Sequence, residues 1–150
     1  MAVRVQTADF DISREIAALS ADRTDIGAVV TFTGLVRGVS AGVPLASMTL
    51  EHYAGMTEAE LARVEAEALA RWPLQASLIV HRVGLLLPGD NIVLVIAASP
   101  HRHAAFEAAA FLMDYLKSRA PFWKKEVDTA GTGTWVDARV TDADALERWK

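Results

Sequence analysis

Lysines gather in one segment of this chain, MDYLKSRAPFWKKE (113–126). Lys117, Lys124 and Lys125 are three of only four lysines, whereas the chain has eleven arginines. Two neighbouring ammonium groups disfavour each other's charged form, and this lowers the pKa of a lysine toward values at which its amine acts as a base or nucleophile. Arginine stays protonated. The segment therefore suits amine chemistry. The alternative is a solvated cluster at a helix C-terminus, where cations suit the helix dipole, and spacing alone favours this alternative.

A second cationic motif, SPHRH (99–103), lies at the predicted start of a helix. His101 and Arg102 fall in the first turn, where free backbone N–H groups already attract anions. Cationic side chains are unfavourable to the helix at this end, and a bound phosphate or carboxylate would relieve that conflict. The alternative is an exposed loop-to-helix junction. Metal binding by His101 is not favoured, because His103 is only two residues away and no Cys or acidic ligand accompanies the pair.

The two motifs are far apart if they share one helix. His101 and Lys117 are sixteen positions apart, which is roughly 24 Å at about 1.5 Å per residue. One small-molecule pocket in one subunit cannot easily use both. Either there are two sites, or a symmetric dimer brings the helix start of one subunit near the lysines of the other. We expect the dimer.

The composition bounds the class of protein. At 150 residues, with 52% hydrophobic residues and a net charge of -4, the chain is expected to be one domain (1–150) with no nucleic-acid partner. It has no Cys, which excludes disulfides, thiolate metal sites and a Cys nucleophile, so any sulfur chemistry must use external sulfur. We predict no cofactor, no metal and no membrane contact, and a cytoplasmic location. The glycine motifs lack the spacing of nucleotide-binding loops.

The pattern of apolar residues predicts an α+β fold, with helices covering one face of a largely antiparallel sheet. The strand 91–99 lacks polar alternation, so it is expected to be buried on both faces. The predicted helices are 11–21, 55–73 and 99–119, and the predicted strands are 27–38, 45–53, 76–90, 91–99 and a closing hairpin of 122–128 with 133–140.

Longer motifs carry a family resemblance. In order along the chain they are VVTFTGLVRG, LEHYAGMTE, RWPL, HRVG followed by PGD, SPHRHAAFEA, MDYLKSRAPFWKKE and WVDAR. Together they resemble the molybdopterin synthase large, catalytic subunit family (MoaE type), from about Gly27 to Arg139. Of these motifs, MDYLKSRAPFWKKE is much more specific than any short glycine pattern.

The resemblance implies a sulfurtransferase that converts cyclic pyranopterin monophosphate to molybdopterin by installing a dithiolene. Sulfur arrives as a thiocarboxylate on the C-terminal Gly-Gly of a small ubiquitin-like partner, whose tail enters a pocket of the large subunit. The implied assembly is a heterotetramer around a homodimer of the large subunit. The implied fold is an α/β hammerhead with an additional antiparallel β-sheet. The missing Cys is then understandable, because the partner carries the sulfur.

The resemblance also implies roles for single residues. Lys117 and Lys124 match the catalytic lysines, with Lys117 the first choice for the essential group and Lys124 as its assistant or transient acyl acceptor. Where the family often has a basic residue two positions before Arg37, this chain has Leu35, which keeps a backbone role but no charge. Substrate binding is implied for Arg37, Leu35, Val36, His101, Arg102, Lys125, Glu126 and Arg139, the last supplied by the neighbouring subunit.

Two other functions remain open. A non-catalytic module would use the same basic pocket to hold the C-terminal carboxylate of a partner protein. A stand-alone hydrolase has weaker support, since no set of nucleophile, base and acid shows a recognisable spacing.

Overall fold

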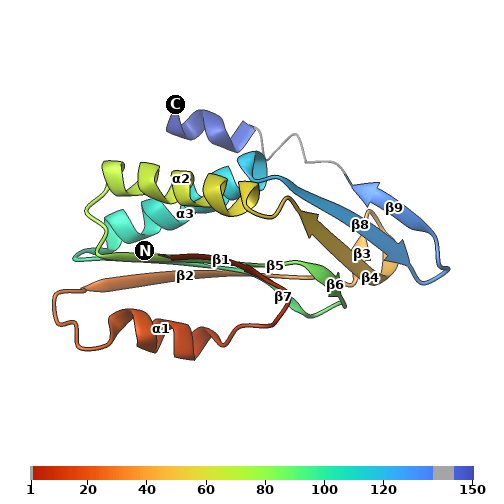
Figure 1. Cartoon of the computed structure of the whole chain (residues 1–150), viewed down its shortest axis with the longest axis horizontal. Coiled ribbons are helices and arrows are strands. Elements are labelled where there is room, and N and C mark those ends of the chain that lie inside the picture. Colours follow the sequence, from red (N-terminus) through yellow and green to blue (C-terminus); the bar gives the residue numbers. More distant parts are fainter. Residues whose placement is uncertain (1, 137–143) are drawn as a thin grey trace.

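The chain forms two β-sheets and flanking helices, so the predicted α+β class is confirmed (Figure 1). The computed structural model describes residues 2–136 and 144–150. In chain order the elements are β1 (Ala2–Gln6), α1 (Ile12–Ser20), β2 (Ala28–Leu35), β3 (Val39–Ser40), β4 (Val43–His52), α2 (Met56–Arg71), β5 (Ala76–Arg82), β6 (Gly84–Leu86), β7 (Asn91–Ser99), α3 (Arg102–Arg119), β8 (Phe122–Asp128), β9 (Gly133–Val136) and the 3-10 helix η1 (Leu146–Trp149).

The first sheet has the strand order β1-β5-β7-β2. β1 pairs with β5 in parallel, and the other neighbours are antiparallel. β7 matches the strand predicted over 91–99, and its residues from Val93 to Ser99 are buried. Figure 1 shows α2 and α3 on one face of this sheet and α1 on the other. The expectation that all helices share one face is therefore wrong for α1, because a strand buried on both faces needs cover on both.

Two apolar clusters lie between the first sheet and the helices on its two faces. On the face of α1, Leu78, Val80 and Ile96 pack against partly buried residues of the helix such as Ile16. On the opposite face, Ile79, Val93 and Val95 pack against α2 and α3, with Leu61, Val64, Phe111 and Leu112 among the helix residues in contact. Alternate residues of β5 thus point to different layers, as strand geometry requires.

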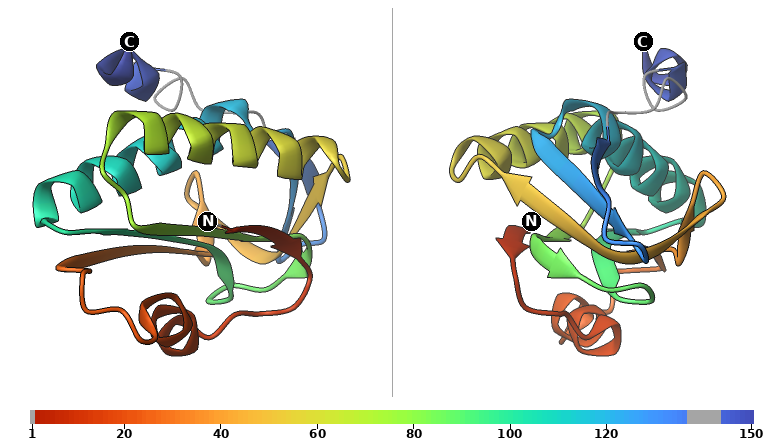
Figure 2. Two further views of the ribbon diagram at one scale, coloured as in Figure 1. Left: turned by 60° about the vertical axis from the view of Figure 1, so that its left-hand side comes forward. Right: turned by 90° about the vertical axis from the view of Figure 1, so that its right-hand side faces the viewer.

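The second sheet has the order β3-β4-β8-β9, and β6 also pairs with β4. The single strand predicted over 76–90 is in fact two strands, because the chain leaves β5 and enters β6 at Gly84. Gly84 has a φ of 89°, a conformation that residues with a side chain rarely adopt. β6 therefore belongs to the second sheet and links the two sheets. The views in Figure 2 show the second sheet at one end of the helical layer.

The corner between α3 and β8 is tied to α2. The buried Thr57 hydroxyl donates a hydrogen bond to the Pro121 carbonyl, at 3.2 Å. Arg119, in the last turn of α3, forms ion pairs with Glu60 at 3.0 Å and Glu67 at 3.2 Å. These contacts fix the direction in which α3 ends and β8 begins, on either side of the proline.

Two elements, β1 and η1, and the position at which α3 begins were not predicted. β1 extends the first sheet, and η1 packs Trp149 against Trp72 with ring centroids 5.6 Å apart. α3 begins at Arg102 with His101 as the N-cap residue, in extended backbone at φ −134° and ψ 153°. The helix starts later than predicted because β7 continues through Ser99, a residue that precedes proline and so disfavours helical backbone. No helix in the described ranges is long and apolar enough to span a membrane.

Candidate active site

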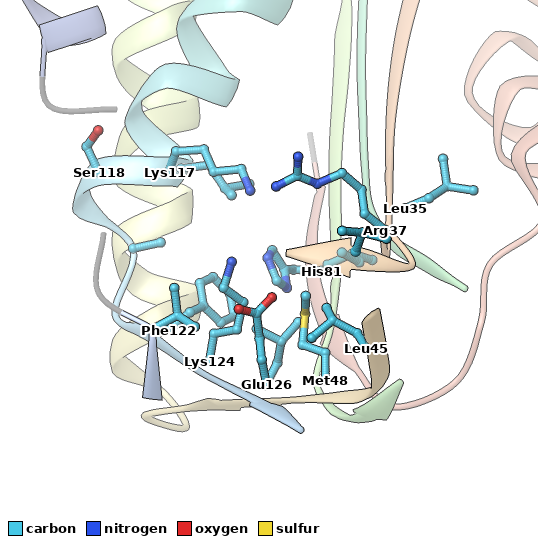
Figure 3. Close-up of a pocket in the computed structure, with 16 residues that line it drawn as sticks. Leu35, Arg37, Leu45, Met48, His81, Lys117, Ser118, Phe122, Lys124 and Glu126 are labelled. Atoms are coloured by element: carbon cyan, nitrogen blue, oxygen red, sulfur yellow. The ribbon is translucent and has the colours of Figure 1, made fainter. Parts of the chain in front are cut away.

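A pocket of about 400 Å³ lies where the end of α3 meets the second sheet and the loop after β2 (Figure 3). Its apolar wall includes Met48, Leu50, Ile92 and Phe122, and its charged lining residues are Arg37, Lys117, Lys124 and Glu126. A cavity with an apolar wall and a few convergent charged groups is the usual form of a small-molecule site. Three cations against one carboxylate make this pocket suitable for an anionic ligand.

The two lysines reach the pocket from different elements. Lys117 lies in the last turn of α3, and Lys124 lies on β8, beyond the bend at Pro121. On β8, Phe122, Lys124 and Glu126 line the pocket, because alternate side chains of a strand share a face. The structure therefore brings Lys117 and Lys124 to one cavity, the arrangement that the sequence suggested.

Lys125 lies outside this pocket. It follows Lys124 on β8 and pairs with Trp135 of β9. Its ammonium lies 6.0 Å from the centroid of the Trp135 ring, a distance at the outer limit of a cation–π contact. The expected pocket role of Lys125 is therefore not matched by the position of its side chain in this subunit.

The loop after β2 is held by the turn before β7. The Val36 N–H donates to the Asp90 carbonyl at 2.9 Å, and the Val36 carbonyl accepts from the Gly89 N–H at 2.8 Å. Val36 itself is buried in a cluster with Met48, Leu50 and Leu86. Both backbone groups and the side chain of Val36 are thus used for structure, while Leu35 and Arg37 on either side line the pocket.

Glu126 is held from the side of the short strand β3. The Ser40 hydroxyl donates to a Glu126 carboxylate oxygen at 2.9 Å. This bond joins a residue of β3 to a residue of β8, the two strands that lie on either side of β4 in the second sheet. It orients a carboxylate beside the cations in Figure 3. Within the described ranges, no group of three or more His, Asp and Glu side chains is placed to hold a metal ion.

His81, on β5, also lines the pocket, although the sequence analysis did not propose it as a site residue. Its ring stacks on Phe122, with centroids 3.8 Å apart and planes 19° apart. Burial lowers the pKa of His81 to about 4, and the nearby Lys117 and His52 side chains act in the same direction, while the bond from Nδ1 to the Arg82 carbonyl opposes them. The imidazole is therefore neutral at neutral pH. The sequence offered no signal beyond a His within an apolar strand.

His101 and Arg102 do not reach this pocket. They are exposed at the start of α3, whereas Lys117 lies near the end of the same helix. Within one subunit the two cationic motifs are therefore separate, as the helix length predicted. Arg139, expected to come from a neighbouring subunit, lies outside the described residues.

The fold and the pocket define a class, an α+β protein with a cation-lined pocket at the junction of its two sheets. The chain belongs to the MoaE protein family, whose model matches residues 5–119. It is 60% identical over 149 residues to a molybdopterin synthase catalytic subunit of Mesorhizobium japonicum, covering 99% of this chain and 92% of that relative.

Solved structures give the same family. The Molybdopterin biosynthesis MoaE protein of Burkholderia ambifaria superposes with a TM-score of 0.84 and 51% identity, covering 99% of this chain and 98% of the other. Molybdopterin synthase of Staphylococcus aureus superposes with a TM-score of 0.82 and 32% identity, covering 89% of this chain and 96% of the other. The two-sheet α+β architecture is thus a property of the family.

Proposed function

We propose that this chain is the catalytic subunit of a molybdopterin synthase, a sulfurtransferase of molybdenum cofactor biosynthesis. Sulfur passes from the C-terminal thiocarboxylate of a small ubiquitin-like partner to cyclic pyranopterin monophosphate, and the dithiolene of molybdopterin forms. Membership of the MoaE family and the name of the Mesorhizobium relative support this proposal. The absence of Cys in the chain agrees with sulfur that is supplied by the partner.

The observation that carries the proposal is the meeting of Arg37, Lys117 and Lys124 in one pocket. Both reactants are anions, since one carries a phosphate and the other a thiocarboxylate. A cleft that concentrates positive charge attracts such groups even in a chain whose net charge is -4. A locally basic pocket is therefore compatible with the negative net charge of the whole chain.

Each sulfur transfer breaks the carbon–sulfur bond of the thiocarboxylate and forms a carbon–sulfur bond on the pterin, in place of a carbon–oxygen bond whose oxygen leaves as water or stays on the phosphate. The acyl group at the partner's C-terminus is then taken up by water and becomes a carboxylate, either directly or after transient transfer to a lysine amine. Lys117 acts as the essential acid–base group or holds the reacting carbonyl, and Lys124 assists or takes the acyl group. Arg37 binds the substrate anion, and Glu126, fixed by Ser40, lines the site. No cofactor is needed for these steps.

His101 and Arg102 join the site through a second copy of the chain. In a homodimer, the exposed start of α3 in one subunit supplies an anion-binding pair to the pocket of the other, together with Arg139. Two small partner subunits complete a heterotetramer. This assembly works in the cytoplasm, in agreement with a chain that lacks Cys.

Reconstitution tests the function directly. The purified chain is mixed with the thiocarboxylated partner and cyclic pyranopterin monophosphate, and dithiolene product is measured. We expect product with the wild-type chain and none without the thiocarboxylate. Tight binding of the partner tail with no product would contradict the proposal and favour the alternative, a binding module for a C-terminal carboxylate.

A further inference from the structure

His81 occupies an unusual position for a polar residue. It lies near the end of β5, only 5% exposed, yet it lines the same pocket as Lys117 and Lys124. On β5 it follows Ser77 and Ile79 on the face that packs against α2 and α3. Stacking on Phe122 fixes the plane of the ring. The side chain is therefore a rigid part of the pocket wall.

The hydrogen bond of His81 determines which ring nitrogen carries the proton. Nδ1 lies 2.8 Å from the carbonyl oxygen of Arg82. A carbonyl can only accept, so Nδ1 donates, and in a neutral imidazole Nε2 then presents a lone pair. Within the described part of the chain, Gln75 Oε1 is the one buried side-chain oxygen or nitrogen without a partner. Nε2 of His81 is therefore not a buried atom without a partner, and His81 is one of the residues that line the pocket.

Charged groups approach His81 from several elements. Besides its own neighbour Arg82 on β5, they are Arg37 after β2, His52 on β4, Lys117 on α3, and Lys124 and Glu126 on β8. The positive charge of Lys117 disfavours a proton on the ring, and the His52 side chain acts in the same direction. Figure 3 shows the imidazole among the charged ends of the labelled lining residues. A neutral imidazole among these cationic side chains can accept a hydrogen bond from one of them.

We propose that His81 is a positioning residue for sulfur transfer, and that its Nε2 accepts a hydrogen bond from the ammonium group of Lys117. This rests on the proposed function of Lys117 as the essential group. The lysine stem is flexible, so an acceptor fixed by Phe122 and Arg82 limits where the nitrogen can be. A carboxylate in this place would also hold the lysine, but it would keep the ammonium charged. A neutral imidazole orients the nitrogen in both protonation states.

Two variants separate positioning from packing. His81→Phe keeps a ring against Phe122 and removes both nitrogens, whereas His81→Gln keeps an acceptor on a side chain of similar reach. We expect His81→Phe to lower kcat by about 10- to 100-fold, the usual cost of a misplaced group, with KM changed by less than about twofold. His81→Gln should recover at least part of kcat. Thermal unfolding of both variants checks that they fold. Unchanged kcat in folded His81→Phe would overturn the proposal.

Nitrogen NMR of the histidine rings tests the contact without any turnover. The chain has only four histidines, so the His81 signals can be assigned by substitution. We expect a proton on Nδ1 and none on Nε2. Lys117→Ala should shift the Nε2 signal and leave Nδ1 nearly unchanged, while Lys125→Ala, on the other face of β8, should shift neither. A proton on Nε2, or no response to Lys117→Ala, would refute the bond. If the wild-type chain makes no product, the proposed function fails, and this measurement still decides the role of His81.

Discussion

His101 and Lys117 lie at opposite ends of the same helix, α3, with His101 as the N-cap and Lys117 in the last turn. The distance along the axis is roughly 24 Å at about 1.5 Å per residue. Lys117 lines the pocket with Lys124, and His101 does not. If both ends of α3 serve one reaction, two copies of the chain must share each site.

Complementation between inactive variants tests the shared site. We expect Arg102→Ala and Lys117→Ala homodimers to be nearly inactive. When the two variants are unfolded and refolded together, half of the dimers carry one subunit of each kind, and one of their two sites contains both intact residues. Activity should then recover to about a quarter of the wild-type value. Product formation in the reconstituted reaction is the measurement.

No recovery in a mixture shown by mass spectrometry to contain mixed dimers would contradict the shared site. A wild-type chain that is monomeric and fully active would contradict it as well. Two copies of a single variant, treated in the same way, provide the control for the refolding procedure.

Charge and proton transfer can be separated at Lys117. Lys117→Ala should lower the single-turnover rate by about 10²- to 10⁴-fold, the range for a group that transfers protons. Lys117→Arg keeps the positive charge but cannot lose its proton. We expect Lys117→Arg to be nearly as slow as Lys117→Ala, while it binds the substrate better. Lys150→Ala, at the exposed end of the chain, is the matched control and should retain full activity.

A Lys117→Arg variant with nearly wild-type activity would show that only the charge is needed. The proposed acid–base role would then be wrong, although a role in binding anions would remain. The same pair of substitutions at Lys124 should cost less, because Lys124 is assigned an assisting role.

The sequence predicted the parts of the fold that depend on local pattern. The strand 91–99 was placed with its observed bounds because its apolar residues are continuous. Trp149 was missed, because its contacts with Trp72 and Phe111 join parts of the chain that are far apart. β1 was missed for a similar reason, since five residues become a strand only by pairing with β5.

In the candidate site, too, some residues could be predicted from local sequence and others depend on tertiary packing. The lysine-rich segment was found from its composition, and its alternation on β8 explains why Lys124 faces the pocket. The pairing of β8 with β4 determines which face of β8 lines the pocket. Residue spacing alone therefore could not show that the Lys125 side chain lies outside the pocket. His81 was missed because a buried structural histidine and a pocket acceptor have the same local sequence. Only packing against Phe122 and the end of α3 distinguishes them.

The corner between α3 and β8 should be sensitive to Thr57. Thr57→Val keeps the shape of the side chain and removes the donor to the Pro121 carbonyl. A hydrogen bond to a partly buried carbonyl contributes about 0.5 to 1.5 kcal/mol, so we expect chemical denaturation to show a loss of that size. We also expect kcat to fall, because Lys117 and Lys124 lie on either side of this corner. Thr57→Ser, which keeps the donor, should restore most of kcat. Equal effects of both substitutions would instead indicate lost packing.

Stability should fall in mild acid because of His81. Its pKa is near 6.5 in the unfolded chain and about 4 in the folded one, so the folded state binds the proton less readily. The contribution is fully present above about pH 6.5 and is lost as the pH falls toward about 4, since protons then bind the unfolded state preferentially. Between about pH 7.5 and about pH 4.5 this amounts to about 2 to 3 kcal/mol.

Urea unfolding of wild type and His81→Gln at both pH values measures this effect. The variant lacks the titrating ring, so its free energy of unfolding should fall by about 2 to 3 kcal/mol less than that of the wild type. Other groups titrate in both proteins and cancel in the comparison. Equal slopes with pH would contradict a neutral, buried His81.

Glu65 offers a test in the opposite direction. Burial raises the pKa of this carboxyl above its ordinary value, although a hydrogen bond from the Ser77 hydroxyl opposes the shift. A raised pKa in the folded state means that stability is greatest when the group is protonated and declines as the pH rises through the folded pKa. Glu65→Gln is uncharged at every pH and keeps an oxygen that accepts from Ser77. We therefore expect a Tm above that of the wild type at neutral pH, because the wild-type chain buries a charge there and the variant does not. The gain should disappear in acid, below the ordinary pKa of a glutamate, where the wild-type carboxyl is also neutral. A lower Tm at neutral pH would mean that the charged carboxylate, with its hydrogen bonds, is the form that the fold requires.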